Sequence, residues 1–473
     1  MWRFVLLVVI VFVTARPSFA QLTAATALNN ASAYTLSAAT QPAASQWYTD
    51  PDFGTLIQRL TDASNADSST VPYSYWPPWN TTSTLFWVAV WPVGGIGGNP
   101  IAQLYDFDPV TGSASNPRVL QVGSPTLVIE GLIWSRLDAN LLYGLGGNLT
   151  LYSLVPGGTP SIVKNLAARV QATLPTASFF WQMSMGGVDR YFAFAVRNAG
   201  AVDIGLAVYD LQTDTLYCRD LSAIGGTFDE AHLTRDGAAL VISANPGTAF
   251  LWDFAAHPTA PFLEKDFGVV IAHEDFGPST QMAASTNPEV SGHYGVWDLA
   301  SFQAGTKTVT QANRFVINVK ATDALVDWPD VHWSWQNLTD STDPTVAYLS
   351  SDVGTDQTAA WRAYFDEIIK VWTDGSGAGP SGSKWRRLAH HRSEIWGTAG
   401  SNYRSYPKGA VDPSGRWYAY SSNWQKAATI GGVTRVDVYL LKIPTEAEFA
   451  AGMYLDHSTV TGSAALSGKV SVP

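Results

Sequence analysis

The chain has 473 residues, a net charge of −11 at pH 7 and a hydrophobic content of 46%. The excess of acidic side chains argues against nucleic acids and anionic membranes as partners, because clustered Lys and Arg side chains bind both. The single cysteine, Cys218, excludes an intramolecular disulfide, so a large apolar core must stabilise the fold.

The first predicted element is a secretory signal over residues 1–20. Arg3 precedes an apolar run from Phe4 to Val13, and Ser18 and Ala20 supply the small residues of a cleavage site. The apolar run is too short to span a bilayer, and no later run is long enough. We therefore expect a secreted or periplasmic protein with no membrane span.

The two ends of the chain differ in composition from its middle. Residues 21–46 are rich in Ala, Thr and Ser and predict an extended N-terminal segment, and residues 456–473 predict a polar C-terminal tail. Residues 47–455 can form one large domain. We expect this domain to be a monomer.

An apolar strand that carries an aromatic residue before a polar turn recurs seven times in this domain. The repeats are about 40 to 75 residues apart, and repeats of this length built only of strands indicate propeller blades. The predicted fold class is therefore all-β, a seven-bladed β-propeller. The seven aromatic residues are Tyr105, Tyr152, Tyr209, Trp252, Trp297, Trp372 and Tyr439.

The ring is predicted to close through an N-terminal strand that completes the last blade. Residues 56–62 resemble the outer strand around Trp385, yet they precede the first blade and have no blade of their own. Pairing with the strand at residues 436–441 would remove an open sheet edge. In the outer strand itself, Arg386 and Arg387 are expected to be charges at the rim.

Histidines mark the predicted inner strands of three successive blades, at His232, His273 and His332, and His391 lies in the loop before the next inner strand. Inner strands run along the channel from one mouth, so these histidines are expected at the same half of that mouth. Such a cluster fits general acid–base catalysis or a divalent metal, calcium or manganese, for which His232, His273 and His332 are the candidate ligands. A purely structural role, in which these side chains form hydrogen bonds between neighbouring blades, explains the cluster equally well. The accompanying carboxylates include Asp229, Glu230, Glu274, Asp275 and Asp330.

Basic and phenolic residues follow His391 in the same loop, at Arg392, Tyr403 and Arg404. They predict a local site for an anionic ligand, since the forked donors of Arg match a carboxylate. The alternative is that they are exposed charges of an ordinary loop. Four tryptophans near loop ends are candidate sugar-stacking platforms, although burial between blades explains these positions as well: Trp333, Trp335, Trp396 and Trp424.

Three short motifs are Arg59-Leu60-Thr61, Trp385-Arg386-Arg387-Leu388, and the inner pair from Pro407 through Asp412-Pro413-Ser414-Gly415-Arg416-Trp417 to Ser422-Asn423-Trp424. They resemble motifs of the TolB-like propellers that include the seven-bladed oligogalacturonate lyases. The resemblance implies lyase chemistry with a histidine base, an assisting arginine and a metal held by a Gln and a His-x-His pair. This chain has no Gln-x-x-His-x-His motif. Ulvan-type lyases that resemble this fold use His, Tyr and Arg alone.

β-Elimination requires a group that neutralises the uronate carboxylate, a base for the C5 proton and an acid for the leaving O4. Arg392 or Arg404 is expected to neutralise the carboxylate, and Tyr403 to act as the acid. The candidate bases are His273, His332 and His391.

The leading prediction is a secreted carbohydrate-active propeller that acts as a polysaccharide lyase on an acidic polysaccharide or oligosaccharide. Whether the chain is an enzyme stays open, because a non-catalytic carbohydrate- or protein-binding propeller fits the same sequence. A glycoside hydrolase is a second alternative. Its catalytic carboxylates would be Glu230, Asp275 and Asp330.

Overall fold

A computed structural model describes the chain from residue 37 to residue 448 with internal gaps. The predicted signal over residues 1–20 and the predicted tail over residues 456–473 lie outside the described residues. In the described part of the chain, no helix is both long enough and apolar enough to cross a membrane. The gaps are 63–67, 92–99, 223, 225–226, 246–247, 257, 259–262, 266–270, 279–280, 287–292, 300–313, 319–329, 338–345, 353–365, 374–383, 394–402, 425–428 and 431–432.

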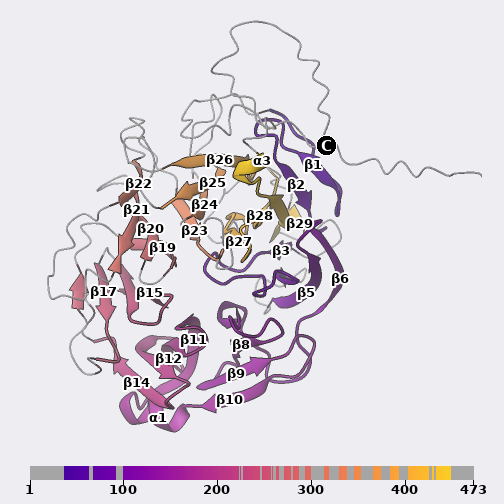
Figure 1. The fold of residues 1–473 in the computed structure, drawn as a ribbon. Coiled ribbons are helices and arrows are strands. Elements are labelled where there is room, and N and C mark those ends of the chain that lie inside the picture. Colours follow the sequence, from indigo (N-terminus) through magenta and orange to yellow (C-terminus); the bar gives the residue numbers. More distant parts are fainter. Residues whose placement is uncertain are drawn as a thin grey trace, which may run out of the picture.

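The fold is an all-β propeller. Among the described residues, six four-stranded antiparallel sheets, each made of consecutive strands, follow one another around a ring (Figure 1). The first three sheets contain β3 (Ser68–Thr70), β4 (Leu85–Trp91), β5 (Ile101–Asp108) and β6 (Ser113–Val119); β7 (Ile133–Trp134), β8 (Leu142–Leu145), β9 (Thr150–Leu154) and β10 (Ser161–Asn165); and β11 (Ala177–Gly186), β12 (Tyr191–Asn198), β13 (Asp203–Asp210) and β14 (Thr215–Asp220).

The next three sheets repeat this plan. They contain β15 (Thr227–Leu233), β16 (Leu240–Asn245), β17 (Thr248–Trp252) and β18 (Leu263–Lys265); β19 (Ile271–Phe276), β20 (Gln281–Thr286), β21 (His293–Asp298) and β22 (Arg314–Asn318); and β23 (Asp330–Ser334), β24 (Val346–Asp352), β25 (Glu367–Trp372) and β26 (Trp385–His390). The short helices are η3 (Ile129–Gly131), α1 (Ala167–Thr173), η5 (Tyr403–Ser405) and α3 (Glu446–Glu448), and β29 (Thr429–Ile430) and β30 (Val433–Thr434) form a small hairpin.

The remaining sheet is built from both ends of the domain. It has five strands, β1 (Trp47–Thr49), β2 (Leu56–Arg59), β31 (Asp437–Lys442), β28 (Trp417–Ser422) and β27 (Ala410–Val411), in this order. The prediction of seven like blades is therefore corrected to six four-stranded sheets and one larger sheet. The difference arises because β1 pairs with the outer edge of β2, which would otherwise expose unpaired backbone groups.

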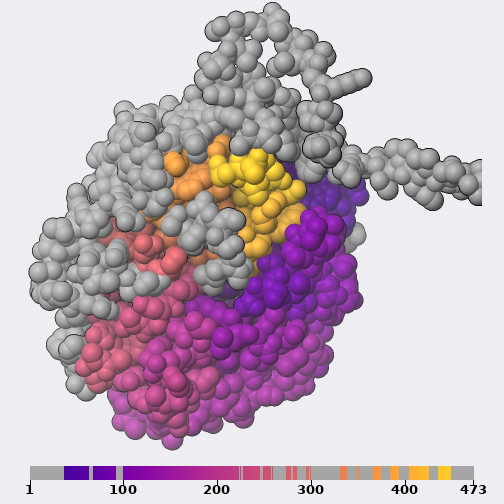
Figure 2. All heavy atoms as spheres, in the orientation of Figure 1, coloured from indigo at the N-terminus to yellow at the C-terminus, as the bar shows by residue number. Residues whose placement is uncertain are grey.

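Strand β2 pairs with β31 in an antiparallel register that sets Arg59 opposite Tyr439. An ion pair of 2.9 Å between Arg59 and the buried carboxylate of Asp437 fixes this register. Figure 2 shows the indigo atoms of the N-terminal part beside the yellow atoms of the C-terminal part.

The repeated aromatic residues lie in the third strand of their sheets, where neighbouring sheets cover them. All seven are buried, from Tyr439 at 0% exposure to Tyr105 at 8%. Packing of these side chains between sheets supplies the large apolar core that a chain without disulfides needs.

Residues 71–78 follow β3 and contact the first strands of three other sheets, β11, β15 and β23; we call these residues the channel segment. Pro72, Pro77 and Pro78 cannot donate a backbone hydrogen bond, which explains why the inner strand of this sheet is interrupted until Trp79 pairs with Phe86. The segment touches other sheets through its aromatic side chains and carbonyls. Trp76 Nε1 donates to the carbonyl of Met183, and Trp134 Nε1 donates to that of Pro78.

Arg386 and Arg387 of β26 are not rim charges, contrary to expectation. Arg387 is fully buried and forms a two-pronged ion pair with Glu367, in which Arg387 Nε lies 2.8 and 3.0 Å from the two carboxylate oxygens. Arg386 is also buried and donates to Glu446 of α3 at 3.0 Å. Strand β25 and helix α3 supply the carboxylates that make this burial tolerable.

Candidate functional site

Two histidines from neighbouring sheets stack face to face. The ring centroids of His273 in β19 and His332 in β23 lie 4.2 Å apart, with an interplanar angle of 16°. His273 has a φ of 53°, which is unusual for this residue type, and it lies in a bulge between Ala272 and Asp275. Its Nδ1–H donates to the carbonyl of Val331 at 3.1 Å, so a neutral His273 carries its lone pair on Nε2. The bulge and this hydrogen bond together orient the imidazole.

Tyr73 of the channel segment covers the histidine pair. Its Oη lies 3.1 Å from His332 Nε2, and its ring centroid lies 5.1 Å from that of His332 and 5.9 Å from that of His273. Lys408 Nζ lies 5.1 Å from the centroid of the Tyr73 ring. A phenol that is hydrogen-bonded to an imidazole and lies near an ammonium group can donate a proton and regain it.

A pocket with an empty volume of about 460 Å³ lies beside Tyr73, and we call it the Arg404 pocket. Trp91, Glu130 and Lys408 also line it. The guanidinium carbon of Arg404 lies 4.0 Å from the centroid of the Trp91 ring, and burial lowers the pKa of this guanidinium. In the part of the chain that the structure describes, Arg404 forms no ion pair with a carboxylate. A stacked guanidinium of this kind can bind the carboxylate of a ligand.

Glu230, His232 and Glu274 form a buried group that we call the Glu-His-Glu cluster. His232 Nδ1 lies 3.1 Å from Glu274 Oε1, and Tyr75 of the channel segment donates its hydroxyl hydrogen to Glu230. Burial and the charge of Glu274 raise the pKa of Glu230. Burial tends to lower the pKa of His232, but the charge of Glu230 and the hydrogen bond to Glu274 outweigh this effect and raise it. Burial tends to raise the pKa of Glu274, but the hydrogen bond from His232 outweighs this effect and lowers it.

The Glu-His-Glu cluster has the donor set of a divalent metal site. One ligand atom from each of Glu230, His232 and Glu274 lies within 4.8 Å of the others. His232 Nε2 and Glu274 Oε2 are buried without a hydrogen-bond partner among the described residues. The residues therefore fit a metal ion. The predicted ligand trio is divided, because His273 and His332 stack on each other while His232 joins the two glutamates.

His232 stands near the end of β15 and not at its start, where the sequence places it. His332 lies in the middle of its strand and His273 in the first half of its own.

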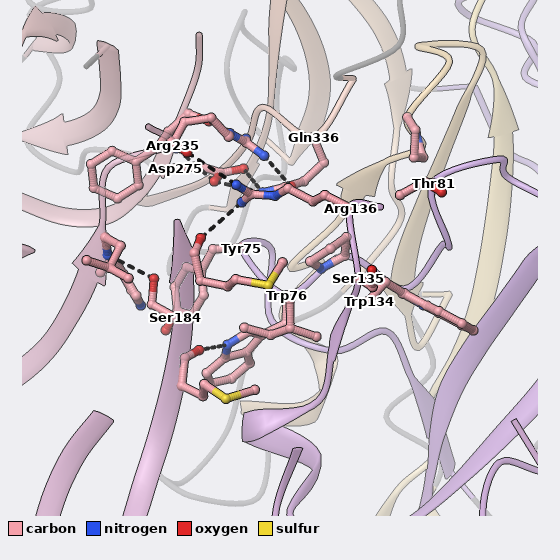
Figure 3. A pocket seen from close by; sticks show the side chains of 18 of the residues that line it. Tyr75, Trp76, Thr81, Trp134, Ser135, Arg136, Ser184, Arg235, Asp275 and Gln336 are labelled. Atoms are coloured by element: carbon pink, nitrogen blue, oxygen red, sulfur yellow. Dashed lines mark hydrogen bonds between the residues drawn. The ribbon is translucent and has the colours of Figure 1, made fainter. Parts of the chain in front are cut away.

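A second pocket, with an empty volume of about 630 Å³, is lined by Tyr75, Trp76 and Pro77 of the channel segment together with residues of other sheets (Figure 3). We call it the Arg136 pocket. Arg136 donates to the carbonyls of Met185 at 3.1 Å and Arg235 at 3.3 Å, and Arg235 donates to those of Phe276 at 3.0 Å and Trp335 at 2.7 Å. The two guanidinium groups therefore bond several sheets to one another.

Comparisons with known proteins identify the fold but no sequence family. No protein-family model matches the chain, and no curated protein matches it in sequence. An oligogalacturonate lyase solved in complex with manganese superposes with a TM-score of 0.56 at 11% identity, over 89% of this chain and 98% of the other. An oligogalacturonate lyase from Vibrio parahaemolyticus superposes with a TM-score of 0.55 at 11% identity, over 89% and 99%.

The chain has the propeller fold of the oligogalacturonate lyases. The resemblance predicted from the sequence motifs is thus confirmed, and at this identity it concerns the fold alone.

Several residues that the sequence predicts for the site lie elsewhere in the structure. His391 is fully buried, with Nε2 3.7 Å from Asp366, and Arg392 is buried with Nη2 3.5 Å from Asp52. The segment that precedes β2 covers Arg392 and removes it from solvent. Because Arg392 is buried beside Asp52 whereas Arg404 lines a pocket, the structure favours Arg404 over Arg392 for binding a ligand.

The predicted sugar platforms Trp333, Trp335 and Trp424 are all at most 4% exposed and are packing residues. Asp275 is also structural, since it accepts hydrogen bonds from the backbone of Trp335 at 2.6 Å and from Gln336 at 2.8 Å. Trp396 and the side chains of Asp330 and Tyr403 lie outside the described residues.

The sequence interpretation missed Tyr73, Tyr75 and Lys408. The signal available for the tyrosines was a run of aromatic and proline residues, Tyr73-Ser74-Tyr75-Trp76-Pro77-Pro78, directly after a strand. Such a run cannot continue a sheet, and its aromatic side chains had to be packed or bound elsewhere.

Proposed function

We propose that this chain is a lyase that cleaves an acidic polysaccharide or oligosaccharide by β-elimination at the Arg404 pocket. The observation that carries the proposal is a series of contacts that leads from the pocket to the histidines. Arg404 and Tyr73 line the same pocket, Tyr73 Oη lies 3.1 Å from His332 Nε2, and His332 stacks on His273. The likeness to the oligogalacturonate lyases supports this reaction class by analogy of fold.

In the proposed reaction, Arg404 binds the uronate carboxylate and thereby makes the C5 proton more acidic. His273 accepts this proton on Nε2, and the electron pair of the C5–H bond forms a C4=C5 double bond. The C4–O4 bond breaks, and Tyr73 donates its hydroxyl proton to O4. His332 begins the step protonated on both ring nitrogens and, hydrogen-bonded to Tyr73 Oη, gives its Nε2 proton to the phenolate, which the charge of Lys408 stabilises meanwhile. Water then takes the proton from His273 and reprotonates His332, which restores the site.

The proposal also includes three features predicted from the sequence, which are export, closure of the ring and a bound metal. The segment over residues 1–20 supports export, and the protein would act as a secreted or periplasmic monomer. The five-stranded sheet would serve as the seventh blade and close the ring, which its β2 and β31 pairing supports. The divalent metal expected from the sequence would belong to the Glu-His-Glu cluster.

The two alternative functions receive less support from the described residues. A glycoside hydrolase needs two available carboxyl groups, whereas Asp275 is occupied by backbone donors and Glu230 by Tyr75. A sugar-binding module needs exposed aromatic platforms, and Trp333, Trp335 and Trp424 are buried.

Incubation with a panel of polyuronates tests the proposed function. The expected result is the ultraviolet absorbance of an unsaturated uronate product on at least one polymer. New reducing ends without that absorbance would indicate hydrolysis instead. Binding of a polymer without any cleavage would favour a non-catalytic module and contradict the proposed lyase.

A further inference from the structure

We infer that the Glu-His-Glu cluster binds a first-row divalent transition metal, with Mn²⁺ and Zn²⁺ as the fitting ions. The inference concerns Glu230, His232 and Glu274, which differ from the Gln and His-x-His ligands that the family resemblance implies. It does not depend on the lyase reaction, because a protein of this fold can hold a metal without cleaving a sugar.

The backbone directs all three side chains to one place. Glu230 and His232 are two residues apart on β15, so they project from the same face of the strand, and Glu274 comes from the neighbouring sheet on β19. A bulge adjoins the ligands in each strand, between Phe228 and Glu230 and between Ala272 and Asp275. Bulges redirect side chains and are frequent beside functional sites.

The charge of the cluster is not balanced by Lys or Arg. Glu230 and Glu274 are 6% and 0% exposed, and within the described ranges the only ion-pair partner of either is His232. Two carboxylates without such partners are costly in a buried site. A divalent cation between them supplies the opposite charge at short range.

The unpartnered atoms are consistent with ligation. His232 Nε2 and Glu274 Oε2 lie in buried side chains and have no hydrogen-bond partner among the described residues. Buried polar atoms of this kind are rare in folded proteins and require an explanation. A metal ion accepts lone pairs from both kinds of atom.

The channel segment orients the proposed ligands from outside the cluster. Tyr75 donates a hydrogen bond to Glu230, and its ring centroid lies 4.1 Å from that of His232. Partners that hold a ligand in this way raise metal affinity in known sites, by about 10- to 100-fold. Metal binding would consequently join β15, β19 and the channel segment.

The ligand types select the class of ion. Two carboxylates and one imidazole suit Mn²⁺ or Zn²⁺, which accept nitrogen together with oxygen. Ca²⁺ requires six to eight oxygen ligands, and Mg²⁺ prefers oxygen and retains several waters. The cluster offers too few oxygens for a calcium site.

Direct binding measurements on the purified full chain, stripped with a chelator and desalted, test the inference. Titration calorimetry with Mn²⁺ and Zn²⁺ is expected to give one ion per chain, and pulsed electron paramagnetic resonance of the Mn²⁺ complex to show coupling to an imidazole nitrogen. Glu230→Gln and Glu274→Gln are each expected to weaken binding by about 10-fold or more. Asp108→Asn, in an exposed turn, is the matched control and should bind like the wild type.

Thermal unfolding provides a second readout that does not depend on the variants. Added Mn²⁺ or Zn²⁺ is expected to raise the unfolding temperature of the stripped wild type, because a ligand that binds the native state stabilises it. Absence of stoichiometric binding, lack of the imidazole coupling, or tighter binding of Ca²⁺ than of Mn²⁺ and Zn²⁺ would overturn the inference. Metal binding without lyase activity would support the metal site and would contradict only the proposed lyase function.

Discussion

Tyr73 Oη lies 3.1 Å from His332 Nε2, although 259 residues separate the two along the chain. The contact exists because the channel segment leaves the sheet of β3 and reaches the inner strand β23 on another part of the ring. It couples a phenol to an imidazole beside the stacked His273, and it is the relationship on which the proposed proton transfers depend.

Tyr73→Phe is expected to lower kcat on a cleaved polyuronate by about 100- to 1,000-fold, because it removes the proposed general acid. The KM should change little, since the carboxylate-binding Arg404 is retained. Initial rates of formation of the unsaturated product measure both constants. Tyr105→Phe removes a hydroxyl whose only hydrogen-bond partner among the described residues is Gln103, and it should keep wild-type rates. Equal losses in the two variants would contradict the role of Tyr73.

Arg404→Met is expected to reduce kcat/KM on an acidic polymer by about 100-fold, because a charge-assisted bond to the carboxylate is lost. Arg404→Lys should restore part of the activity. Comparison with the methyl-esterified polymer is decisive, because the ester has no carboxylate to bind and the variants should then differ little from wild type. A loss of the same size on both polymers would assign Arg404 a structural role.

Arg387→Met is expected to destabilise the fold by about 3–5 kcal/mol, because it leaves the carboxylate of Glu367 buried without its partner. Chemical denaturation monitored by tryptophan fluorescence gives the free energy of unfolding. Arg118→Met breaks an ion pair whose side chains are 34% and 44% exposed, and it should cost at most about 1 kcal/mol. Similar costs for both variants would show that the Arg387 pair is not a buried one in solution.

Asp50→Asn is expected to make stability less dependent on pH. Burial raises the pKa of Asp50 from 3.8 to about 6, although the charge of Arg392 opposes the shift. The folded state therefore favours the protonated acid, and this contribution is present below pH 3.8 and lost as the pH rises through about 6. The loss amounts to roughly 2–3 kcal/mol.

Denaturation curves at pH 4 and pH 7 check this prediction for Asp50. The wild type should lose more of its unfolding free energy between the two values than Asp50→Asn does, and the difference between them isolates this one group. Parallel pH profiles for both proteins would show that Asp50 keeps an ordinary pKa in the native state.

The fold was predictable from the sequence because its strongest signal is repeated. The third strand of each sheet carries an aromatic side chain that is buried between sheets. Strand β2 is recognisable because its sequence resembles that of an outer strand, although no blade precedes it in the chain. Both signals are local, and therefore a single sequence contains them. The additional strand of the five-stranded sheet, β1, forms a hairpin with β2 and so extends the pairing of β2 with β31 by one strand.

The site was predictable only where a residue belongs to an inner strand. His273 and His332 follow from their strand positions, whereas Tyr73 and Tyr75 act through contacts with strands more than 150 residues away. Burial of Arg387 and His391 depends in the same way on distant partners, since Thr55 donates to the carbonyl of Leu388 across 333 residues. Sequence alone marks these residues as polar and gives no sign of what covers them.

The sheet built from both ends also has a consequence for the order of folding. Arg59 and Asp437 are 378 residues apart, so β2 leaves the ribosome long before its partner β31 is synthesised. The six four-stranded sheets use consecutive strands and can form during synthesis, but the last sheet must wait for nearly the whole chain. Until then the edge of β2 that faces β31 in the native sheet has no partner, and it is a place where the nascent chain can pair with another molecule.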